Sequence, residues 1–228
     1  MEQVAENLWV PRYPLGLLGV EIGRTVTIVR LKSGKLVIHS TAPFTSGDVA
    51  QISSLGEPAW LLDATTFHDS FAEQGRRVFS TIPYLVPEGF PGAASLNAQP
   101  LHRSPDEWTD ELEVLPVGGV PRIRENVMFH VPSRTLVVAD LLFNFGQKAS
   151  GWTKFFARYV MRLKDGVGTS PFFRSMIRDR AAFEDSIRKM LSCDIERIIV
   201  AHGEMIERDP KQHLERLLSG RPIDSHGC

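Results

Sequence analysis

Runs of β-branched residues recur along this chain, and in each half of it they precede segments with helical periodicity. Residues 25–30 and 35–40 flank a turn that contains Gly34, which predicts a β-hairpin in the first half. Strands and helices of this kind cover one another, because each must bury an apolar face. The order of the segments therefore predicts an α+β fold in which two sheets pack face to face with helices outside.

The chain has 228 residues, of which 43% are apolar and 23% are charged, so it can bury a substantial core. We expect a single domain over residues 1–228, with halves of about 23–110 and 111–220. Residues 83–105 are rich in Pro, Gly, Ala and Ser, and predict a loop or short helix on the surface where the halves join. The other predicted strands are 59–62, 112–117, 124–130, 135–140 and 195–200, and the predicted helices are 49–55, 67–77, 152–163, 172–178, 179–191 and 211–218.

Charge and composition exclude several classes of protein. The formal net charge is −1 and no block of Lys or Arg occurs, so we expect no nucleic-acid partner. No run approaches the ~20 apolar residues that span a bilayer, so we expect no membrane partner either. The first residues lack the features of a signal sequence, and Cys193 and Cys228 form no C-x-x-C pattern. These features favour a cytoplasmic protein. We expect its partner to be a small-molecule substrate or ligand.

Two polar residues end apolar strands in the second half of the chain. Asp140 follows the run at 135–139, and His202 follows the run at 198–201. Strands hold their side chains rigidly, and the turns after them leave room for a ligand. Because carboxylate and imidazole groups are metal ligands, Asp140 and His202 predict one side of a metal site.

A resemblance to a known family extends from Val26 to Glu207. TLVVADLLFN resembles the segment of the metallo-β-lactamase superfamily that supplies a bridging aspartate, and RIIVAHGEMI is similar to the one that supplies its last histidine ligand. LKSGKLVIHS, ATTFHDSF and ENVMFHVPSRTLVVADLLFNF resemble a poorly characterised branch, whose members often lack part of the metal centre. The resemblance implies a four-layer αββα sandwich, with two mixed sheets, and descent from metal-dependent hydrolases.

The main metal-binding motif of that superfamily, H-x-H-x-D-H, has only a partial match in the segment TTFHDS. If Asp69 is aligned with the aspartate of the motif, then Thr65, Phe67 and Ser70 stand at the three histidine positions. If His68 is aligned with the second histidine instead, Ser70 stands opposite the aspartate. Each register recovers a single ligand, so a complete dinuclear centre is not expected.

A further histidine of the family, normally found ahead of the Asp140 hairpin, has no match in the GGVPR segment. The resemblance therefore implies a reduced site that holds at most one divalent metal ion. Its ligands would be Asp140 and His202 together with either His68 or Asp69. The ion would be zinc, iron or manganese, and the alternative is that the site holds none.

Glu125 is a candidate substitute ligand or general base. It shares strand parity with Val127 and Phe129, which predicts that its side chain points inward with theirs. A carboxylate at a core-facing position is rare unless it has a partner. The candidate catalytic residues are therefore His68, Asp69 and Glu125.

Each candidate also has a purely structural interpretation. Asp69 lies three residues after Thr66, which is the spacing of a helix capping box, and His68 is then an ordinary first-turn residue. Asp140 can cap the segment that follows it. The aromatic stripe over residues 152–163 favours a buried helix face over a surface for a membrane or a partner.

Three functions are consistent with these residues. The first is a hydrolase in which metal-activated water attacks an ester, thioester, lactone or phosphoester. The second is a catalytically inactive member of the fold that binds a ligand or another protein. The third is an enzyme that works without metal and uses Glu125 or His68 as general base. No G-x-S-x-G elbow, P-loop or strand-linked G-x-G-x-x-G occurs, which argues against serine hydrolases, nucleotide-driven enzymes and dinucleotide enzymes.

Overall fold

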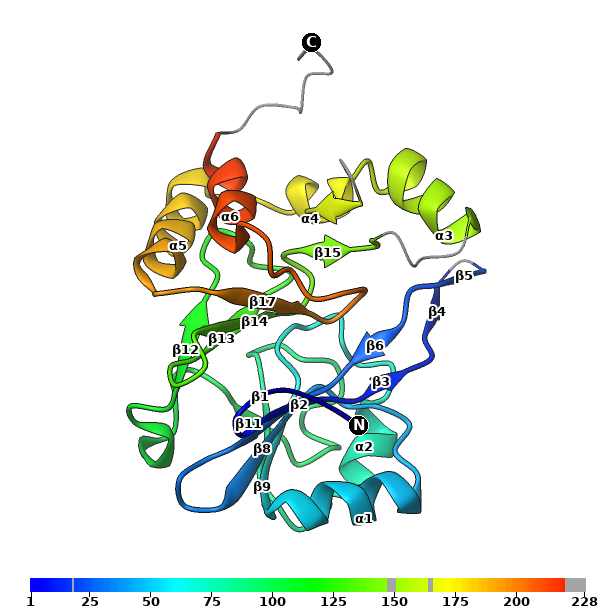
Figure 1. The fold of residues 1–228 in the computed structure, drawn as a ribbon, viewed down its shortest axis with the longest axis vertical. Coiled ribbons are helices and arrows are strands. Elements are labelled where there is room, and N and C mark those ends of the chain that lie inside the picture. The colour runs from blue at the N-terminus through cyan, green and yellow to red at the C-terminus, as the bar shows by residue number, and fades with distance from the viewer. Residues whose placement is uncertain (18, 147–150, 164–165, 220–228) are drawn as a thin grey trace.

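Two β-sheets form the centre of the protein (Figure 1). This computed structural model describes residues 1–17, 19–146, 151–163 and 166–219. In spatial order, the strands of the larger sheet are β1 (Glu2–Ala5), β2 (Leu8–Val10), β7 (Thr27–Arg30), β8 (Lys35–His39), β9 (Glu57–Leu62), β10 (Tyr84–Val86) and β11 (Gln99–Pro100). Those of the smaller sheet are β12 (Leu112–Pro116), β13 (Asn126–His130), β14 (Thr135–Val138) and β17 (Arg197–Val200).

Both sheets are mixed. In the larger sheet, β8 is antiparallel to β7 but parallel to β9, and β9 is parallel to β10. In the smaller sheet, β12, β13 and β14 run antiparallel in sequence, whereas β17 pairs with β14 in parallel. A parallel pair needs a long crossover connection, and the chain between β14 and β17 supplies it.

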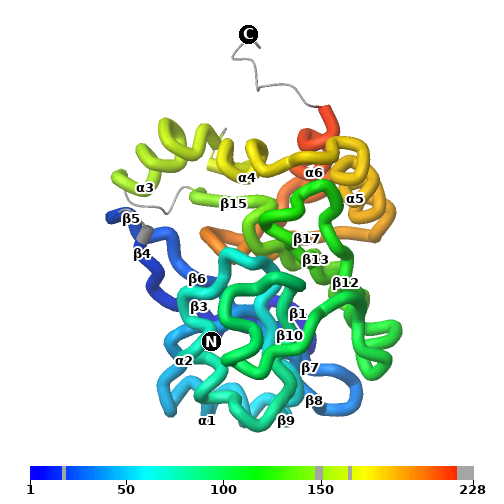
Figure 2. The backbone as a smooth tube through the Cα atoms, turned by 180° about the vertical axis from the view of Figure 1, so that it is seen from behind, coloured from blue at the N-terminus to red at the C-terminus, as the bar shows by residue number. Residues whose placement is uncertain are grey.

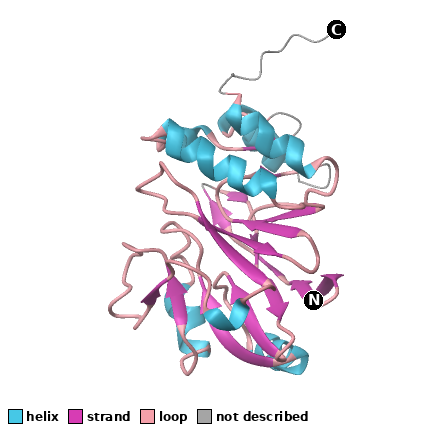
Figure 3. Ribbon diagram, turned by 90° about the vertical axis from the view of Figure 1, so that its left-hand side faces the viewer, coloured by secondary structure: helices cyan, strands magenta, loops and turns pink. Residues whose placement is uncertain are grey.

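Helices cover the outer face of each sheet (Figure 3). The larger sheet packs against α1 (Ser46–Leu55) and α2 (Ala72–Val78), and the smaller sheet packs against α5 (Arg180–Ser192) and α6 (Pro210–Leu218). A third apolar core lies between the sheets; its members include Val37, Leu62, Met128, Val137 and Ile199. These layers are those of the predicted αββα sandwich, so that prediction is confirmed. Because the core between the sheets draws residues from both halves, we infer a single domain.

Several local predictions are also confirmed. β7 and β8 form the expected hairpin, whose turn contains Gly34 at a φ of +83°. At the start of α1, the backbone N–H of Asp48 donates to the hydroxyl of Thr45, and the N–H of Thr45 donates to the carboxylate of Asp48. This reciprocal capping box explains why the helix begins at Ser46.

The prediction of a surface loop or short helix over residues 83–105 is wrong in part, because this segment contributes β10 and β11 to the larger sheet. All three residues of β10 are buried. β10 and β11 are too short to show alternating hydrophobicity in the sequence. The same holds for the two-residue strands outside the two sheets. These are β3 (Arg12–Tyr13), β4 (Gly16–Leu17), β5 (Val20–Glu21), β6 (Arg24–Thr25), β15 (Phe143–Asn144) and β16 (Val167–Gly168).

The helix predicted over residues 152–163 consists of α3 (Gly151–Phe155) and a π-helical turn at Phe156–Val160, followed by non-helical chain. Phe156 and Leu163 are buried, as expected for a core-facing stripe. The other apolar members of the stripe are exposed, namely Trp152, Phe155, Tyr159 and Val160. The prediction that the stripe is a buried face is therefore wrong for most of its side chains. Viewed from behind, α3 and α4 (Pro171–Ser175) lie along one end of the molecule (Figure 2).

None of the helices formed by the described residues is both long enough and apolar enough to cross a membrane.

Gly203 fixes the turn that leaves β17. Its φ is +110°, and a Cβ atom there would lie 1.9 Å from the carbonyl oxygen of Asn144. The neighbouring backbone makes use of this approach, because the N–H of Glu204 donates to that same oxygen at 2.8 Å. Only glycine combines this conformation with so close a contact.

We predict that Gly203→Ala lowers the free energy of unfolding by at least ~2 kcal/mol more than Gly34→Ala does. Gly34 also has a positive φ, of +83°, but a Cβ atom there would meet nothing within 4 Å. The control therefore carries the backbone strain without the steric overlap. Urea denaturation of both variants measures the difference, and equal losses would contradict the proposed contact.

Candidate metal centre

The parallel pairing of β14 with β17 places Asp140 and His202 side by side. Val138 pairs with Val200, so each of the two polar residues lies two positions beyond a paired strand end. Atom Nε2 of His202 is 3.8 Å from Oδ1 of Asp140. The strand register thus brings together two residues that are 62 positions apart in the sequence.

His68 reaches the same point from the larger sheet. It lies in the turn between β9 and α2, where the hydroxyl of Thr65 donates to the carbonyl oxygen of Ile123 at 3.1 Å. Atom Nε2 of His68 is 3.5 Å from Oδ1 of Asp140. The His68 ring meets the His202 ring edge to face, with 5.3 Å between their centroids. Both sheets therefore contribute to one site.

Contacts on the far side of each imidazole turn its Nε2 atom toward Asp140. Nδ1 of His202 donates to the carbonyl oxygen of Gly23 at 2.7 Å, so in the neutral ring Nε2 carries the lone pair. Nδ1 of His68 lies 3.5 Å from the hydroxyl of Ser40. Nε2 of His68 and Oδ2 of Asp140 are buried and have no hydrogen-bond partner within the described ranges. Buried polar atoms without partners are costly, which points to a ligand.

These side chains fit one metal ion. His68, Asp140 and His202 each offer one ligand atom, and the three atoms lie within 4.8 Å of one another. Two ligands of a tetrahedral ion, each at ~2.0–2.1 Å from it, are about 3.4 Å apart, close to the two distances from Asp140. Imidazole and carboxylate donors suit zinc and other divalent transition metals. Neither Asp69 nor Glu125 belongs to this group of described residues.

The protonation states also suit a cation. Burial lowers the pKa of His202 to about 3, and the adjacent His68 adds to this effect. Burial alone would raise the pKa of Asp140, but His68, His202 and Arg24 together lower it to about 2. At neutral pH, Asp140 is therefore an anion and His202 is neutral, as metal ligands must be.

Arg24, which sequence analysis did not identify, lies beside these residues. It is the first residue of the two-residue strand β6, and it is 1% exposed. Its Nη1 atom lies 3.4 Å from the hydroxyl of Ser40, and its Nε has no hydrogen-bond partner among the residues described. No periodicity or motif marks Arg24 in the sequence. Burial lowers the pKa of Arg24, against the opposing effect of Asp63 and Asp140.

A buried polar network holds the larger-sheet side of the site. The carboxylate of Asp63 accepts hydrogen bonds from the N–H and hydroxyl of Thr41 and from the hydroxyl of Tyr84, at 3.0, 2.8 and 2.7 Å. Burial raises the pKa of Asp63, while the positive charge of Arg24 opposes that rise. His39 lies in the same region, where burial lowers its pKa to about 3. The network orders the turn that leads to the site.

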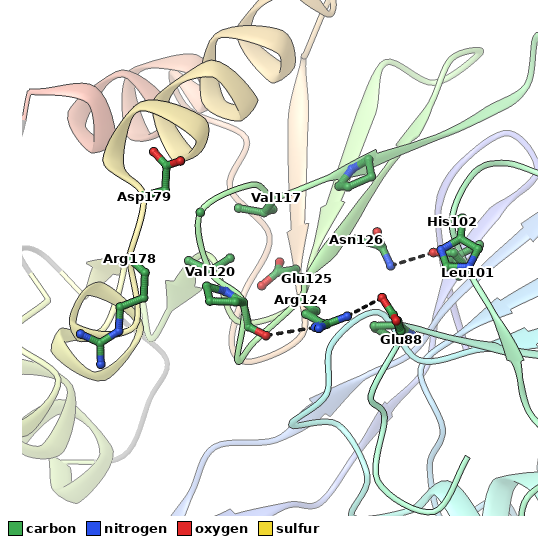
Figure 4. Close-up of a pocket in the computed structure, with 14 residues that line it drawn as sticks. Glu88, Leu101, His102, Val117, Val120, Arg124, Glu125, Asn126, Arg178 and Asp179 are labelled. Carbon is green, nitrogen blue, oxygen red and sulfur yellow. Dashed lines mark hydrogen bonds and ion pairs between the residues drawn. The ribbon is translucent and has the colours of Figure 1, made fainter. Parts of the chain in front are cut away.

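Glu125 holds the backbone that carries Asp140. Its carboxylate accepts hydrogen bonds from the N–H groups of Ala139 and Asp140, at 2.8 and 3.0 Å. Glu125 also borders a cavity of about 460 Å³, shown in Figure 4. The adjacent Arg124, which lines the same cavity, forms an ion pair with Glu88 and not with Glu125. Burial and the charge of Asp140 raise the pKa of Glu125 to about 8. The expected inward orientation is found, and the roles of substitute ligand and general base stay predictions.

Asp69 is exposed and does not belong to the three-residue group. The capping-box interpretation of Asp69 is wrong, because α2 begins three residues later and its N-cap, Phe71, makes no side-chain capping bond. The hydroxyl of Thr66 donates instead to the carbonyl oxygen of Arg122 at 2.7 Å. A role for Asp69 as ligand or catalyst stays a prediction.

A cavity of about 580 Å³ opens above the three residues. Its polar lining includes His68, Asp140, His202 and Arg24. Its walls are mostly apolar and include Ile22, Ile123, Phe143, Phe156, Met161 and Phe173. The Phe143 ring stacks on the His202 ring, with 5.5 Å between centroids, and so fixes its plane. The cavity suits a molecule with a polar reacting group and an apolar remainder.

We predict that Glu125 makes a contribution to the stability of the metal-free protein that is lost as pH rises from about 4.5 toward 8, and that Glu125→Gln removes this contribution. In that window the folded protein keeps the Glu125 proton that the unfolded chain releases, so each pH unit costs up to ~1.4 kcal/mol. Below about pH 6.5 the buried His39 and His202, whose pKa values are lowered, contribute with the opposite sign, so the test compares the slopes of the two proteins. Denaturation at several pH values, with chelator present, measures the slope. An unchanged slope in Glu125→Gln would show that Glu125 does not titrate there.

Comparison with known proteins identifies the fold. No protein-family model matches the sequence, and no curated protein matches it either. Among solved structures, the chain is similar to the DIM-1 metallo-β-lactamase, with 16% identity, a TM-score of 0.61 and coverage of 96% of this chain and 94% of that one. A metallo-β-lactamase from Pontibacter korlensis has 14% identity, a TM-score of 0.60 and coverage of 96% and 98%. The mono-zinc form of FIM-1 from Pseudomonas aeruginosa has 14% identity, a TM-score of 0.61 and coverage of 95% and 93%. This chain therefore has the fold of the metallo-β-lactamase superfamily.

Proposed function

We propose that this protein is a hydrolase in which His68, Asp140 and His202 would hold a single divalent metal ion. The observation that carries the proposal is the convergence of three ligand atoms, from three separate segments, within 4.8 Å. The unpartnered Nε2 of His68 and Oδ2 of Asp140 support it, since a cation would satisfy both. A mono-zinc form is known for a protein of the same fold, FIM-1.

The bound ion would supply Lewis acidity, which activates water and polarises a carbonyl or phosphoryl oxygen. Asp140 would remain ionised and contribute negative charge, while the Gly23 carbonyl and the Phe143 ring would hold the plane of His202. Arg24 would stabilise negative charge that develops on the substrate, because its buried guanidinium borders the cavity. An ester, thioester, lactone or phosphoester would provide such a group.

We predict that protein purified without chelators contains zinc, iron or manganese at close to one ion per chain, and that Asp140→Asn and His202→Ala lose it. Removal of one ligand from a three-ligand site should weaken metal binding by at least tenfold. Elemental analysis measures the content. His213→Ala is the matched control, because His213 is a partly exposed histidine of α6 outside the site.

A second readout tests the same site without assuming activity. Added zinc at ~100 times its Kd should stabilise the wild-type protein by about 2.7 kcal/mol and leave Asp140→Asn unchanged. Thermal unfolding with and without metal provides the comparison. If the stability of the metal-free protein does not respond to added zinc, iron or manganese, the metal proposal is wrong.

The buried Arg24 favours a second candidate function, that of a ligand-binding module without catalysis. A fixed cation 1% exposed beside Asp140 partly neutralises the carboxylate that a metal would need. Its unpartnered Nε would instead bind an anionic or carbonyl group of a ligand in the cavity. Absence of metal, together with absence of turnover in an esterase and phosphodiesterase screen, would favour this candidate.

An enzyme that works without metal is a third possibility, and His68 suits it better than Glu125 does. His68 borders the cavity and its Nε2 atom makes no hydrogen bond to another described residue, whereas both oxygens of Glu125 accept backbone hydrogen bonds. Activity that survives chelation and is lost in His68→Gln would identify this mechanism. Activity that chelation abolishes and zinc restores would exclude it.

A further inference from the structure

Large apolar side chains gather on the surface around the mouth of the cavity above His68. Six of them are more than 40% exposed, and we call this set the aromatic rim: Phe67, Trp152, Phe155, Tyr159, Val160 and Phe172, at 43, 59, 48, 61, 53 and 55%. Within the described chain, the other exposed large hydrophobic residues are Met1 and Val131. An exposed apolar patch of this kind marks an interaction site.

The rings of the rim pack on one another rather than into the core. Trp152 stacks on Phe155 with 5.3 Å between centroids, and Phe155 contacts Tyr159 at 4.7 Å. Phe67 and Phe172 form a second, edge-to-face pair at 5.6 Å. The rim therefore has a preformed shape, so little side-chain entropy is lost when another surface covers it.

The buried residues of α3 and its π-helical turn fix which way the rim faces. Thr153, Phe156 and Ala157 are buried, and Phe156 and Ala157 join the apolar cluster that contains Val20 and Phe143. The aromatic stripe on the same helix thus faces outward. α3 and α4 lie at one end of the molecule, away from α1 and α2 (Figure 1).

Basic residues surround the rim. Residues 151–178 carry six basic side chains and one acidic side chain, whereas the whole chain has a net charge of −1. Lys154, Arg158, Arg162 and Arg174 are exposed members of this set. On neighbouring elements, exposed acidic groups include Glu21, Asp69 and Asp179. The carboxylate of Glu21 accepts hydrogen bonds from the N–H groups of Leu15 and Gly23, and that of Asp179 accepts one from the N–H group of Ala182. The remainder of the protein is correspondingly acidic.

We propose that the aromatic rim docks on an anionic lipid surface. Trp and Tyr favour the boundary between headgroups and hydrocarbon, and Lys and Arg beside them contact anionic headgroups. A protein partner or a second copy of the chain would match the apolar residues, but the surrounding positive charge repels an identical rim. The absence of membrane-spanning segments does not bear on this contact, because an interfacial face lies on the bilayer rather than across it.

Docking would present the cavity to the bilayer. Phe67, Val160 and Phe172 belong both to the rim and to the lining of the cavity, so the cavity mouth would lie at the lipid surface. A lipid ester could then enter along apolar walls while its polar group approaches Asp140. The entry of a lipid ester as substrate rests on the proposed hydrolase function, whereas docking itself needs neither metal nor catalysis.

The tryptophans offer a direct test of docking. Trp9, Trp60 and Trp108 are at most 8% exposed, so Trp152 dominates any change in emission when the protein binds vesicles. We expect the full-length protein to sediment with vesicles that contain phosphatidylglycerol, with a blue shift of its emission. Binding should weaken at least tenfold in neutral phosphatidylcholine vesicles and decline at high salt.

Two sets of variants separate apolar from electrostatic contributions. The triple variant Trp152→Ser, Phe155→Ser, Tyr159→Ser should lose at least tenfold in vesicle binding, and so should Lys154→Glu with Arg158→Glu. Trp152→Phe should still bind but lose the blue shift. Val131→Ser and Arg103→Glu are the matched controls, because Val131 is 41% exposed and the Arg103 side chain 84% exposed, both outside the rim.

Three results would overturn the proposal. The first is absence of vesicle binding by the wild-type protein, and the second is binding that the rim variants and the control variants reduce equally. The third is a concentration-dependent dimer that the triple variant abolishes, without vesicle binding, which would assign the rim to self-association. Zinc content and its loss in Asp140→Asn are measured separately, so failure of docking and failure of the hydrolase proposal are distinguishable.

Discussion

The site depends on one long-range interaction, the parallel pairing of β14 with β17. Four consecutive pairs, from Thr135 with Arg197 to Val138 with Val200, set the register. A slip by one residue would turn every side chain of one strand to the opposite face and separate Asp140 from His202. The register is secured because these strands are buried between the helical layer and the facing sheet. Gly203 and Glu125 then fix the strand ends from either side.

The parts of the fold that could be predicted from sequence are those with long local patterns. The hairpin of β7 and β8 and the strands β13, β14 and β17 contain runs of consecutive apolar residues, and α1 follows a capping residue. The resemblance of the TLVVAD and RIIVAH segments added the layer order, and the solved structures of similar fold agree with it. Strands of two or three residues, such as β6 and β10, carry too little pattern to detect.

The site was predictable only in part for a related reason. His68, Asp140 and His202 were all candidates, but sequence could not choose between His68 and its neighbour Asp69, because the choice depends on how the turn after β9 folds. The hydroxyl groups of that turn bond to the loop before β13, a tertiary contact without local signal. Arg24 was missed because nothing in a two-residue strand distinguishes a buried arginine from an exposed one.

The aromatic stripe over residues 152–163 shows why periodicity alone cannot separate a core from an interface. Phe156 and Leu163 are buried, while Trp152, Phe155 and Tyr159 at the same kind of spacing are exposed. The spacing of apolar residues indicates that a helix has an apolar side. The charged residues beside that side indicate whether the protein core or another surface covers it. Here the rest of the protein leaves most of the apolar side exposed, and the residues beside it are basic. A stripe that faced the core would not need these basic residues. The same helical segment can therefore line the cavity with Phe156 and present a docking surface with Trp152, Phe155 and Tyr159.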